Sequence, residues 1–179
     1  MKQPAWLSRS MPDSPDRPLL FLDVDGPLIP FGVPDPHLDG VATSRMPVPE
    51  GGNPLLARID PQHGPRLAAL PCDLVWATTW MADANNVICP LLGLPELPVV
   101  DWPDSEDDQG PLRWKTRGLV EWAAGRSFVW VDDEITQADR AWVSAHHDAQ
   151  AHLHRVDPRR GLTGSDFAAI ADWLARLQR

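Results

Sequence analysis

Five short apolar segments form the main hydrophobic pattern of the chain. They cover residues 18–22, 73–77, 97–102, 127–131 and 151–156, and the third is the weakest. A short continuous run of apolar residues is typical of a parallel strand that is buried on both faces. We therefore predict about five strands, and the first, second and fourth end directly before the polar residues Asp23, Thr78 and Asp132.

Segments with apolar residues at helical spacing lie between these strands, at 61–70, 82–93, 112–124 and 135–145. A last helix follows a start of the capping-box type at Thr163 and Asp166, and its apolar stripe predicts core packing. The alternation of strands and helices predicts an α/β fold. We expect a Rossmann-like three-layer sandwich with a central parallel sheet, whose ligands bind beyond the carboxyl ends of the strands.

Residues 27–58 are the least regular part of this pattern, with seven prolines and four glycines. Such a segment cannot form a long helix, and a loop of this length in a compact domain is usually functional. We expect a flap over the first strand and no large cap domain. Residues 1–17, which are polar and rich in proline, predict a disordered arm, and residues 18–179 predict a single domain.

The composition is that of a globular protein, with 43% hydrophobic and 23% charged residues. The net charge of −9 disfavours non-specific binding to nucleic acid or to an anionic membrane, although a local basic site remains compatible with it. Five arginines are candidates for such a basic rim, although surface arginines are more often simply solvated: Arg113, Arg117, Arg155, Arg159 and Arg160. The acidic run 104–108 predicts a solvated loop.

The two cysteines and the N-terminus leave these expectations unchanged. Cys72 and Cys89 lack metal-ligand spacing, so we interpret them as small apolar residues. The N-terminus has no apolar segment of the signal-peptide type, and no stretch is long and apolar enough to span a bilayer. We expect a cytoplasmic location and no membrane partner.

The polar residues at the strand ends carry the candidate chemistry. Asp23 and Asp25 follow the first strand on alternate positions, so both side chains can leave the same side of the chain, and Gly26 permits a sharp bend. Two such carboxylates suit an all-oxygen Mg²⁺ site. One can act as a nucleophile that forms an aspartyl-phosphate, and the other as a general acid and base. The alternative is an Asp-initiated turn.

The later strand ends offer partners for these carboxylates. Either Thr78 or Thr79 can donate a hydroxyl to a phosphoryl oxygen, although Thr78 can also simply close a strand. Lys115 can neutralise phosphate and one carboxylate. Of Asp132 and Asp133, one is expected to bind the metal and the other to anchor Lys115, unless the pair only caps the following helix.

The ordered set of Asp23, Asp25, Thr78, Lys115 and the Asp132–Asp133 pair resembles the four motifs of the haloacid dehalogenase (HAD) superfamily. The resemblance implies Asp23 as nucleophile and Mg²⁺ ligand, and Asp25 as acid and base with its backbone carbonyl on Mg²⁺. It also implies that Thr78 and Lys115 hold the phosphoryl group and that Asp133, more than Asp132, completes the metal shell.

Six segments more narrowly resemble an uncapped HAD subgroup that accompanies bacterial Swiss Army Knife RNA-repair proteins: 75–80, 84–85, 114–116, 130–134, 156–158 and 161–163. Gly26, Thr79 and Asn85 are possible substrate contacts. Pro27 departs from the superfamily, which usually has Thr or Val there. Asp25 favours phosphate over halide chemistry, and the position of the acidic pair after the lysine argues against a receiver domain.

These residues lead to one main functional hypothesis and two alternatives. We expect a Mg²⁺-dependent phosphohydrolase that forms an aspartyl-phosphate, with an open site that admits a bulky substrate such as a phosphorylated nucleic-acid end or a nucleotide. The alternatives are a phosphotransferase or phosphomutase, and a non-catalytic regulatory protein that keeps the fold. The residues specify a phosphorylated substrate but neither its identity nor an oligomeric state.

Overall fold

A computed structural model describes residues 17–32, 53–102 and 114–179. Its centre is a four-stranded parallel sheet in the order β2-β1-β3-β4, built from β1 (Leu19–Leu22), β2 (Asp73–Trp76), β3 (Phe128–Asp132) and β4 (Ala151–Arg155). The chain moves outward from β1 to β2 on one side and through β3 to β4 on the other. The order therefore reverses between β1 and β3, and ligands of open α/β sheets bind at such a switch point.

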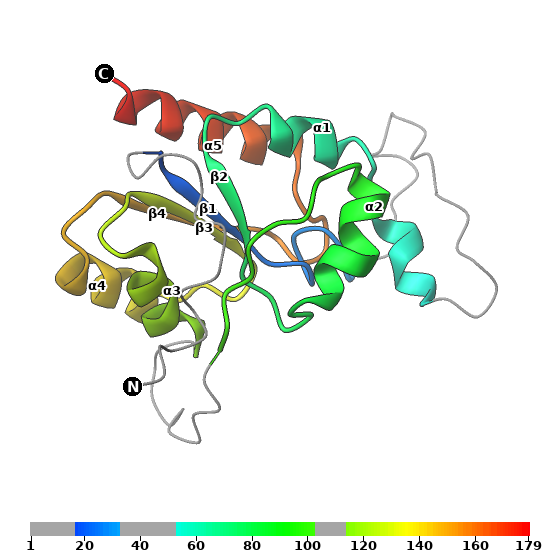
Figure 1. Cartoon of the computed structure of the whole chain (residues 1–179), viewed down its shortest axis with the longest axis horizontal. Coiled ribbons are helices and arrows are strands. Elements are labelled where there is room, and N and C mark those ends of the chain that lie inside the picture. The colour runs from blue at the N-terminus through cyan, green and yellow to red at the C-terminus, as the bar shows by residue number, and fades with distance from the viewer. Residues whose placement is uncertain (1–16, 33–52, 103–113) are drawn as a thin grey trace, which may run out of the picture.

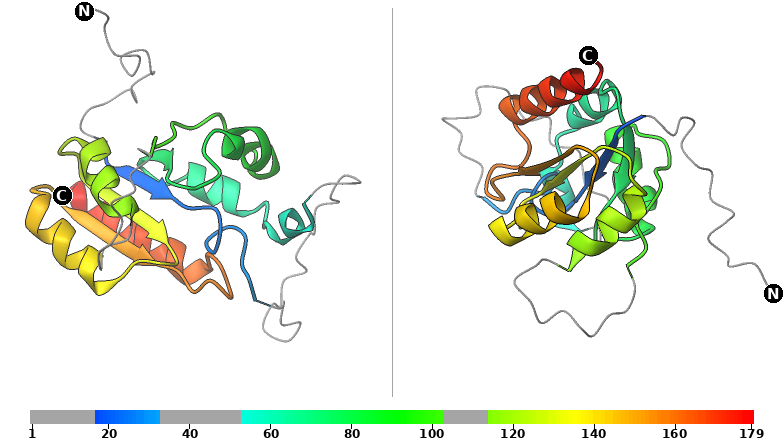
Figure 2. Two further views of the ribbon diagram at one scale, coloured as in Figure 1. Left: turned by 90° about the horizontal axis from the view of Figure 1, so that it is seen from below. Right: turned by 90° about the vertical axis from the view of Figure 1, so that its left-hand side faces the viewer.

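Helices cover both faces of this sheet (Figures 1 and 2). On one face α1 (His63–Ala68), α2 (Cys89–Leu92) and α5 (Gly164–Leu177) enclose a core with Leu20, Leu22 and Trp76. On the other, α3 (Lys115–Ala123) and α4 (Gln137–His146) pack over Phe21 and Trp130. All four residues of β1 are fully buried because both faces are covered, which explains its unbroken apolar run. The predicted three-layer α/β sandwich is confirmed.

The weakest predicted strand, 97–102, is not a strand in the structure. It forms one isolated bridge between Trp76 and Val99, next to hydrogen bonds from Trp76 N to Pro98 O (2.8 Å) and from Val100 N to Trp76 O (2.9 Å). Pro98 has no N–H group to extend the ladder. The described sheet therefore has four strands rather than about five.

The predicted helix at 82–93 contains an irregular turn. A π-helical turn, η3 (Ala84–Ile88), precedes α2, which ends at Gly93 in the left-handed conformation (φ 65°). A π-helical turn inserts a residue into the helical ladder, and such turns often occur at special sites. The last helix begins as predicted, with Thr163 and Asp166 forming a capping box at the start of α5.

Parts of the predicted flap pack against the loop after β4. Phe31 N donates to Pro158 O (2.7 Å) and Leu162 N donates to Pro27 O (2.8 Å). A 3₁₀ turn, η2 (Pro54–Arg58), follows, and its Arg58 side chain donates to the Pro30 carbonyl (2.8 Å). The rest of the flap, most of the expected N-terminal arm, the acidic loop 104–108 and Arg113 lie outside the described residues. The residues that the structure describes form no cap domain.

No helix in the described ranges is both long enough and apolar enough to cross a membrane.

Candidate active site

The end of β1 is fixed against β3 on one side and turns sharply afterwards. Asp23 N donates to Val131 O (3.1 Å), and the Asp23 carboxylate accepts from Val24 N (2.8 Å). Gly26 then adopts φ +88°, where a Cβ atom would lie 2.5 Å from Cγ of Asp133. Glycine at this position therefore permits both the left-handed turn and the close approach of the Asp133 carboxyl group.

Lys115 connects the two central strand ends. Its Nζ lies 2.7 Å from Oδ2 of Asp23 and 2.8 Å from Oδ2 of Asp132, and the lysine is only 4% exposed. At the start of α3, Thr116 Oγ1 donates to Asp139 on α4 (2.6 Å). This contact fixes the first turn of α3 against α4 and so holds the ammonium group between the carboxylates.

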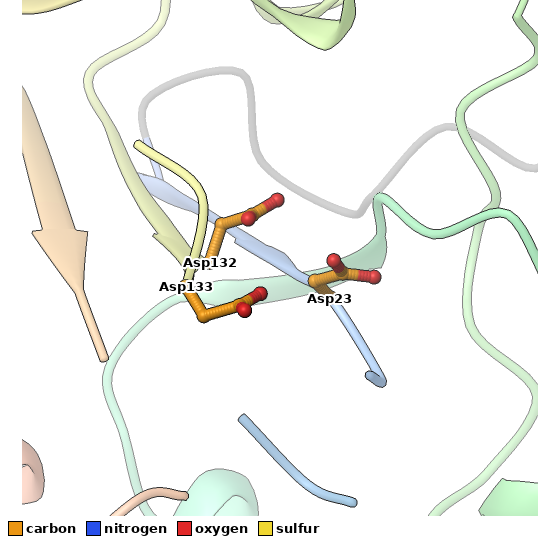
Figure 3. Close-up of side chains that lie close together, drawn as sticks. All are labelled: Asp23, Asp132 and Asp133. Carbon is orange, nitrogen blue, oxygen red and sulfur yellow. The ribbon is translucent and has the colours of Figure 1, made fainter. Parts of the chain in front are cut away.

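Three carboxylates gather at this edge of the sheet. Asp23, Asp132 and Asp133 each offer an oxygen within 4.8 Å of the others, and the Asp133 carboxylate is directed toward Asp23 (Figure 3). Burial, followed by the negative charge of Asp132, raises the pKa of Asp23 to about 7 although Lys115 opposes this shift. Burial and then Asp132 also raise the pKa of Asp133. One ammonium group does not balance this charge, so the donor set fits a divalent cation with oxygen ligands.

The two adjacent aspartates have different surroundings. Asp132 accepts from Lys115 and Trp130 Nε1 (3.3 Å) at one oxygen and from Glu134 N (2.8 Å) at the other. Among the described residues, no other side chain donates a hydrogen bond to the Asp133 carboxylate. This difference favours Asp132 as the anchor of Lys115 and Asp133 as the metal ligand.

The two threonines after β2 also differ. Ala77 N donates to Leu22 O (2.9 Å), which aligns the residues after β2 with the end of β1. Thr78 is fully buried directly after this contact, whereas Thr79 is exposed. Thr78 Oγ1 accepts from Trp80 N (3.3 Å) and retains its own hydroxyl proton as a donor. The structure therefore favours Thr78, directly after the residue that pairs with the end of β1, over the exposed Thr79 as the candidate hydroxyl donor.

Asp25 has a partner that the sequence did not reveal. Its Oδ2 atom accepts a hydrogen bond from the indole Nε1 of Trp80 (3.0 Å), 55 residues further along the chain. Both side chains are half-buried. The sequence placed Trp80 in the segment 75–80 but did not indicate a contact with Asp25, because this contact depends on the fold.

A comparison with known protein families bears on this arrangement. The family model described as the HAD domain in Swiss Army Knife RNA repair proteins matches residues 19–167, which include every residue of the site described above. The chain belongs to this family. No solved structure matches the chain. Its fold and motifs are thus those of a HAD domain, which supports a phosphatase-like hydrolase.

The side chain of Asn85 in this HAD domain makes internal hydrogen bonds, whereas the sequence suggested a substrate contact. Its Oδ1 accepts from Trp76 Nε1 (2.9 Å), Leu97 N (2.9 Å) and the Cys89 thiol (3.3 Å), and its Nδ2 donates to Leu97 O (2.8 Å). These bonds tie the π-helical turn to β2 and to the segment that only partly joins the sheet. The structure therefore assigns Asn85 a structural role.

Arginines lie around the carboxyl edge of the HAD domain. Arg155 Nε donates to the backbone carbonyl of Asp133 (2.9 Å), and Arg159 and Arg160 are exposed on the loop that packs against residues 27–31. Arg58, which the sequence did not single out, joins them through its bond to Pro30. Arg117 instead lies over the ring of Trp142, 6.0 Å from its centroid. Three of the five predicted rim arginines therefore lie on the elements that border the site.

Proposed function

We propose that this HAD domain is a Mg²⁺-dependent phosphohydrolase that cleaves a phosphate ester through an aspartyl-phosphate on Asp23. The observation that carries the proposal is the buried bridge of Lys115 between Asp23 and Asp132, beside a third carboxylate, Asp133. A buried ion cluster is a weak source of stability. Its assembly from three separate elements at the switch point is better explained by chemistry than by folding.

The first half-reaction transfers the phosphoryl group to the protein. A carboxylate oxygen of Asp23 attacks phosphorus and forms the new P–O bond, while the bond between phosphorus and the leaving oxygen breaks. Asp25 gives its proton to that oxygen, and the product leaves as an alcohol. Thr78 donates its hydroxyl hydrogen to a phosphoryl oxygen, and Lys115 offsets charge beside the nucleophile.

The second half-reaction regenerates Asp23. The ionised Asp25 takes a proton from water as the water oxygen attacks phosphorus, and the bond between phosphorus and the Asp23 oxygen breaks. The products are inorganic phosphate, a free Asp23 carboxylate and a protonated Asp25. The two aspartates therefore return to their starting states without another reactant.

The residues present fit a resident Mg²⁺ ion. Asp23, Asp133 and the backbone carbonyl of Asp25 would hold it, whereas Asp132 accepts hydrogen bonds from Lys115, Trp130 and Glu134 and would remain the anchor of the lysine. A divalent cation at such a site neutralises negative charge on the phosphoryl oxygens.

An open site and the arginines support a bulky, polyanionic substrate. The described residues form no cap, and Arg58, Arg155, Arg159 and Arg160 lie on the elements around the carboxyl edge of the sheet. The family takes its name from RNA repair proteins, so a phosphorylated nucleic-acid end or a nucleotide is the substrate that we propose. The net charge of −9 favours contact with a strand end rather than with a long duplex.

The proposal is tested with a panel of phosphate esters that includes p-nitrophenyl phosphate, nucleotides and oligonucleotides with terminal phosphates. We expect release of inorganic phosphate with Mg²⁺ that is abolished by EDTA and by Asp23→Asn. Asp148→Asn, which alters an exposed carboxylate in the loop that precedes β4, is the matched control and should leave the rate unchanged. Wild-type protein that is inert across the panel would refute the proposal, and phosphate transferred to an added alcohol would indicate a phosphotransferase instead.

A further inference from the structure

The side chain of Asp25 is held from one direction. Trp80 Nε1 donates to its Oδ2 atom at 3.0 Å, and this is the one side-chain hydrogen bond to Asp25 within the described ranges. The remaining oxygen, Oδ1, accepts no hydrogen bond from a side chain in the described ranges. The indole thus fixes one end of the carboxyl group and leaves the other end available.

The turn that carries Trp80 is itself well restrained. Thr78 O accepts from Met81 N (3.4 Å) and from the indole of Trp102 (3.2 Å), while Thr78 Oγ1 accepts from Trp80 N (3.3 Å). Met81 adopts φ +50°, a conformation that is uncommon for residues other than glycine. The Trp80 ring also packs against the core on the α1 and α5 face. Several contacts therefore hold a strained turn that aims the indole at Asp25.

We propose that Trp80 is a positioning residue for Asp25, an inference that rests on the proposed phosphohydrolase function. An indole N–H can only donate, so its bond requires a lone pair on Oδ2. This favours the proton of the neutral Asp25 on Oδ1, which faces away from the indole. In the first half-reaction that proton moves from Oδ1 to the leaving oxygen, and in the second Oδ1 accepts a proton from water.

Such a role predicts a dependence on the leaving group that a purely structural residue would not show. An alkyl phosphate needs a proton on its leaving oxygen, whereas 2,4-dinitrophenyl phosphate releases a stable anion without one. General acid catalysis contributes roughly 10²–10⁴-fold to a rate, and a misdirected acid loses part of this factor. We expect Trp80→Phe to lower kcat/KM for an alkyl phosphate by about 10-fold or more and to change kcat/KM for the dinitrophenyl ester little. This ratio reports phosphoryl transfer to Asp23 and not the later hydrolysis of the aspartyl-phosphate, in which Asp25 acts for both substrates.

Trp102→Phe is the matched control, because Trp102 supports the same turn through Thr78 O but does not contact Asp25. If the effect of Trp80→Phe came from a loosened turn, both variants would lower kcat/KM for the two substrates alike. Asp25→Asn gives the reference for complete loss of the acid. In the Asp25→Asn background Trp80→Phe should cause no further loss, since its effect passes through Asp25.

Replacement of Trp80 by β-(3-benzothienyl)alanine keeps the shape of the ring system and removes only the N–H, so it tests the proposal even if the Phe variant does not fold. An equal loss of kcat/KM for both substrates, or full additivity with Asp25→Asn, would overturn the role of Trp80. If wild-type protein hydrolyses neither substrate, or if Asp25→Asn lowers kcat/KM for both substrates alike, the proposed function fails instead. A selective loss that disappears in the Asp25→Asn background would support the proposal.

Discussion

A single buried ammonium group, that of Lys115, lies between two buried carboxylates, and this balance decides how the site responds to substitution. Asp23 and Asp132 are 7% and 1% exposed, so neither has much water to replace a lost partner. The pKa of Lys115 is raised by the two carboxylates in spite of its burial. The lysine is therefore charged throughout the neutral range, and its contribution is to offset buried negative charge.

Removal of that charge should destabilise the protein strongly. In Lys115→Met two buried carboxylates lose their cation, and breaking a buried pair in this way costs about 3–5 kcal/mol. We expect urea unfolding in EDTA at pH 8 to show a free energy of unfolding that is lower by this amount. The double variant with Asp132→Asn should regain part of it, because one unpaired charge is then removed. Equal stability of Lys115→Met and wild-type protein would show that the cluster is not buried as described.

Asp23 should affect the pH dependence of stability in the metal-free protein. Its folded-state pKa of about 7 exceeds the pKa of 3.8 of an unperturbed aspartate, so ionisation is harder in the folded state than in the unfolded state. Its stabilising contribution is therefore complete below the unfolded pKa and is lost as the pH rises through about 7.

Asp23→Asn should consequently raise the melting temperature in EDTA at pH 8, on the order of 5 °C, because no buried charge has to form. At pH 4 the wild-type carboxyl is protonated in the folded state and still partly protonated in the unfolded state, so the gain should be small. Differential scanning calorimetry at both pH values measures this, with Asp148→Asn as the exposed control. A larger gain in melting temperature at pH 4 than at pH 8 would contradict the upward shift of the Asp23 pKa.

At the scale of elements, strands and helices with a strong pattern were predictable, and elements that depend on tertiary contacts were not. The unbroken apolar run of β1 and the cap of α5 carry local signals that the fold obeys. The segment 97–102 has a strand-like composition, but Pro98 and its edge position limit it to one bridge. The motif order located Asp23 and Lys115, whereas the indole on Asp25 joins residues too distant for any local pattern.

Asn85 tests this distinction. Local sequence suggested a substrate contact, while the structure gives it four hydrogen bonds: one with Trp76 of β2, two with Leu97 and one with Cys89. Asn85→Ala would leave the indole of Trp76 and the backbone of Leu97 without these partners, at a cost of about 3 kcal/mol. We expect a lower melting temperature and unchanged KM in the folded enzyme. An increased KM at unchanged stability would favour the substrate contact.

At the scale of the whole molecule, the topology concentrates negative charge at one point of an already acidic chain. The switch point between β1 and β3 brings Asp23 together with Asp132 and Asp133, although more than 100 residues separate them in the sequence. Their mutual repulsion destabilises the folded state of the metal-free protein. A bound divalent cation removes this repulsion, so metal binding and stability are coupled.

This coupling predicts a metal-dependent melting temperature. At a Mg²⁺ concentration of about 100 times the dissociation constant, binding stabilises the folded state by about 2.7 kcal/mol, which corresponds to a shift of roughly 5–10 °C in a chain of this size. Asp133→Asn should abolish the shift, because it removes the carboxylate that is free to bind. Asp132→Asn should retain a part of it, because Asp132 holds Lys115. If both variants keep the full shift, the stabilising cation binds elsewhere, and the carboxylates at the switch point are not its site.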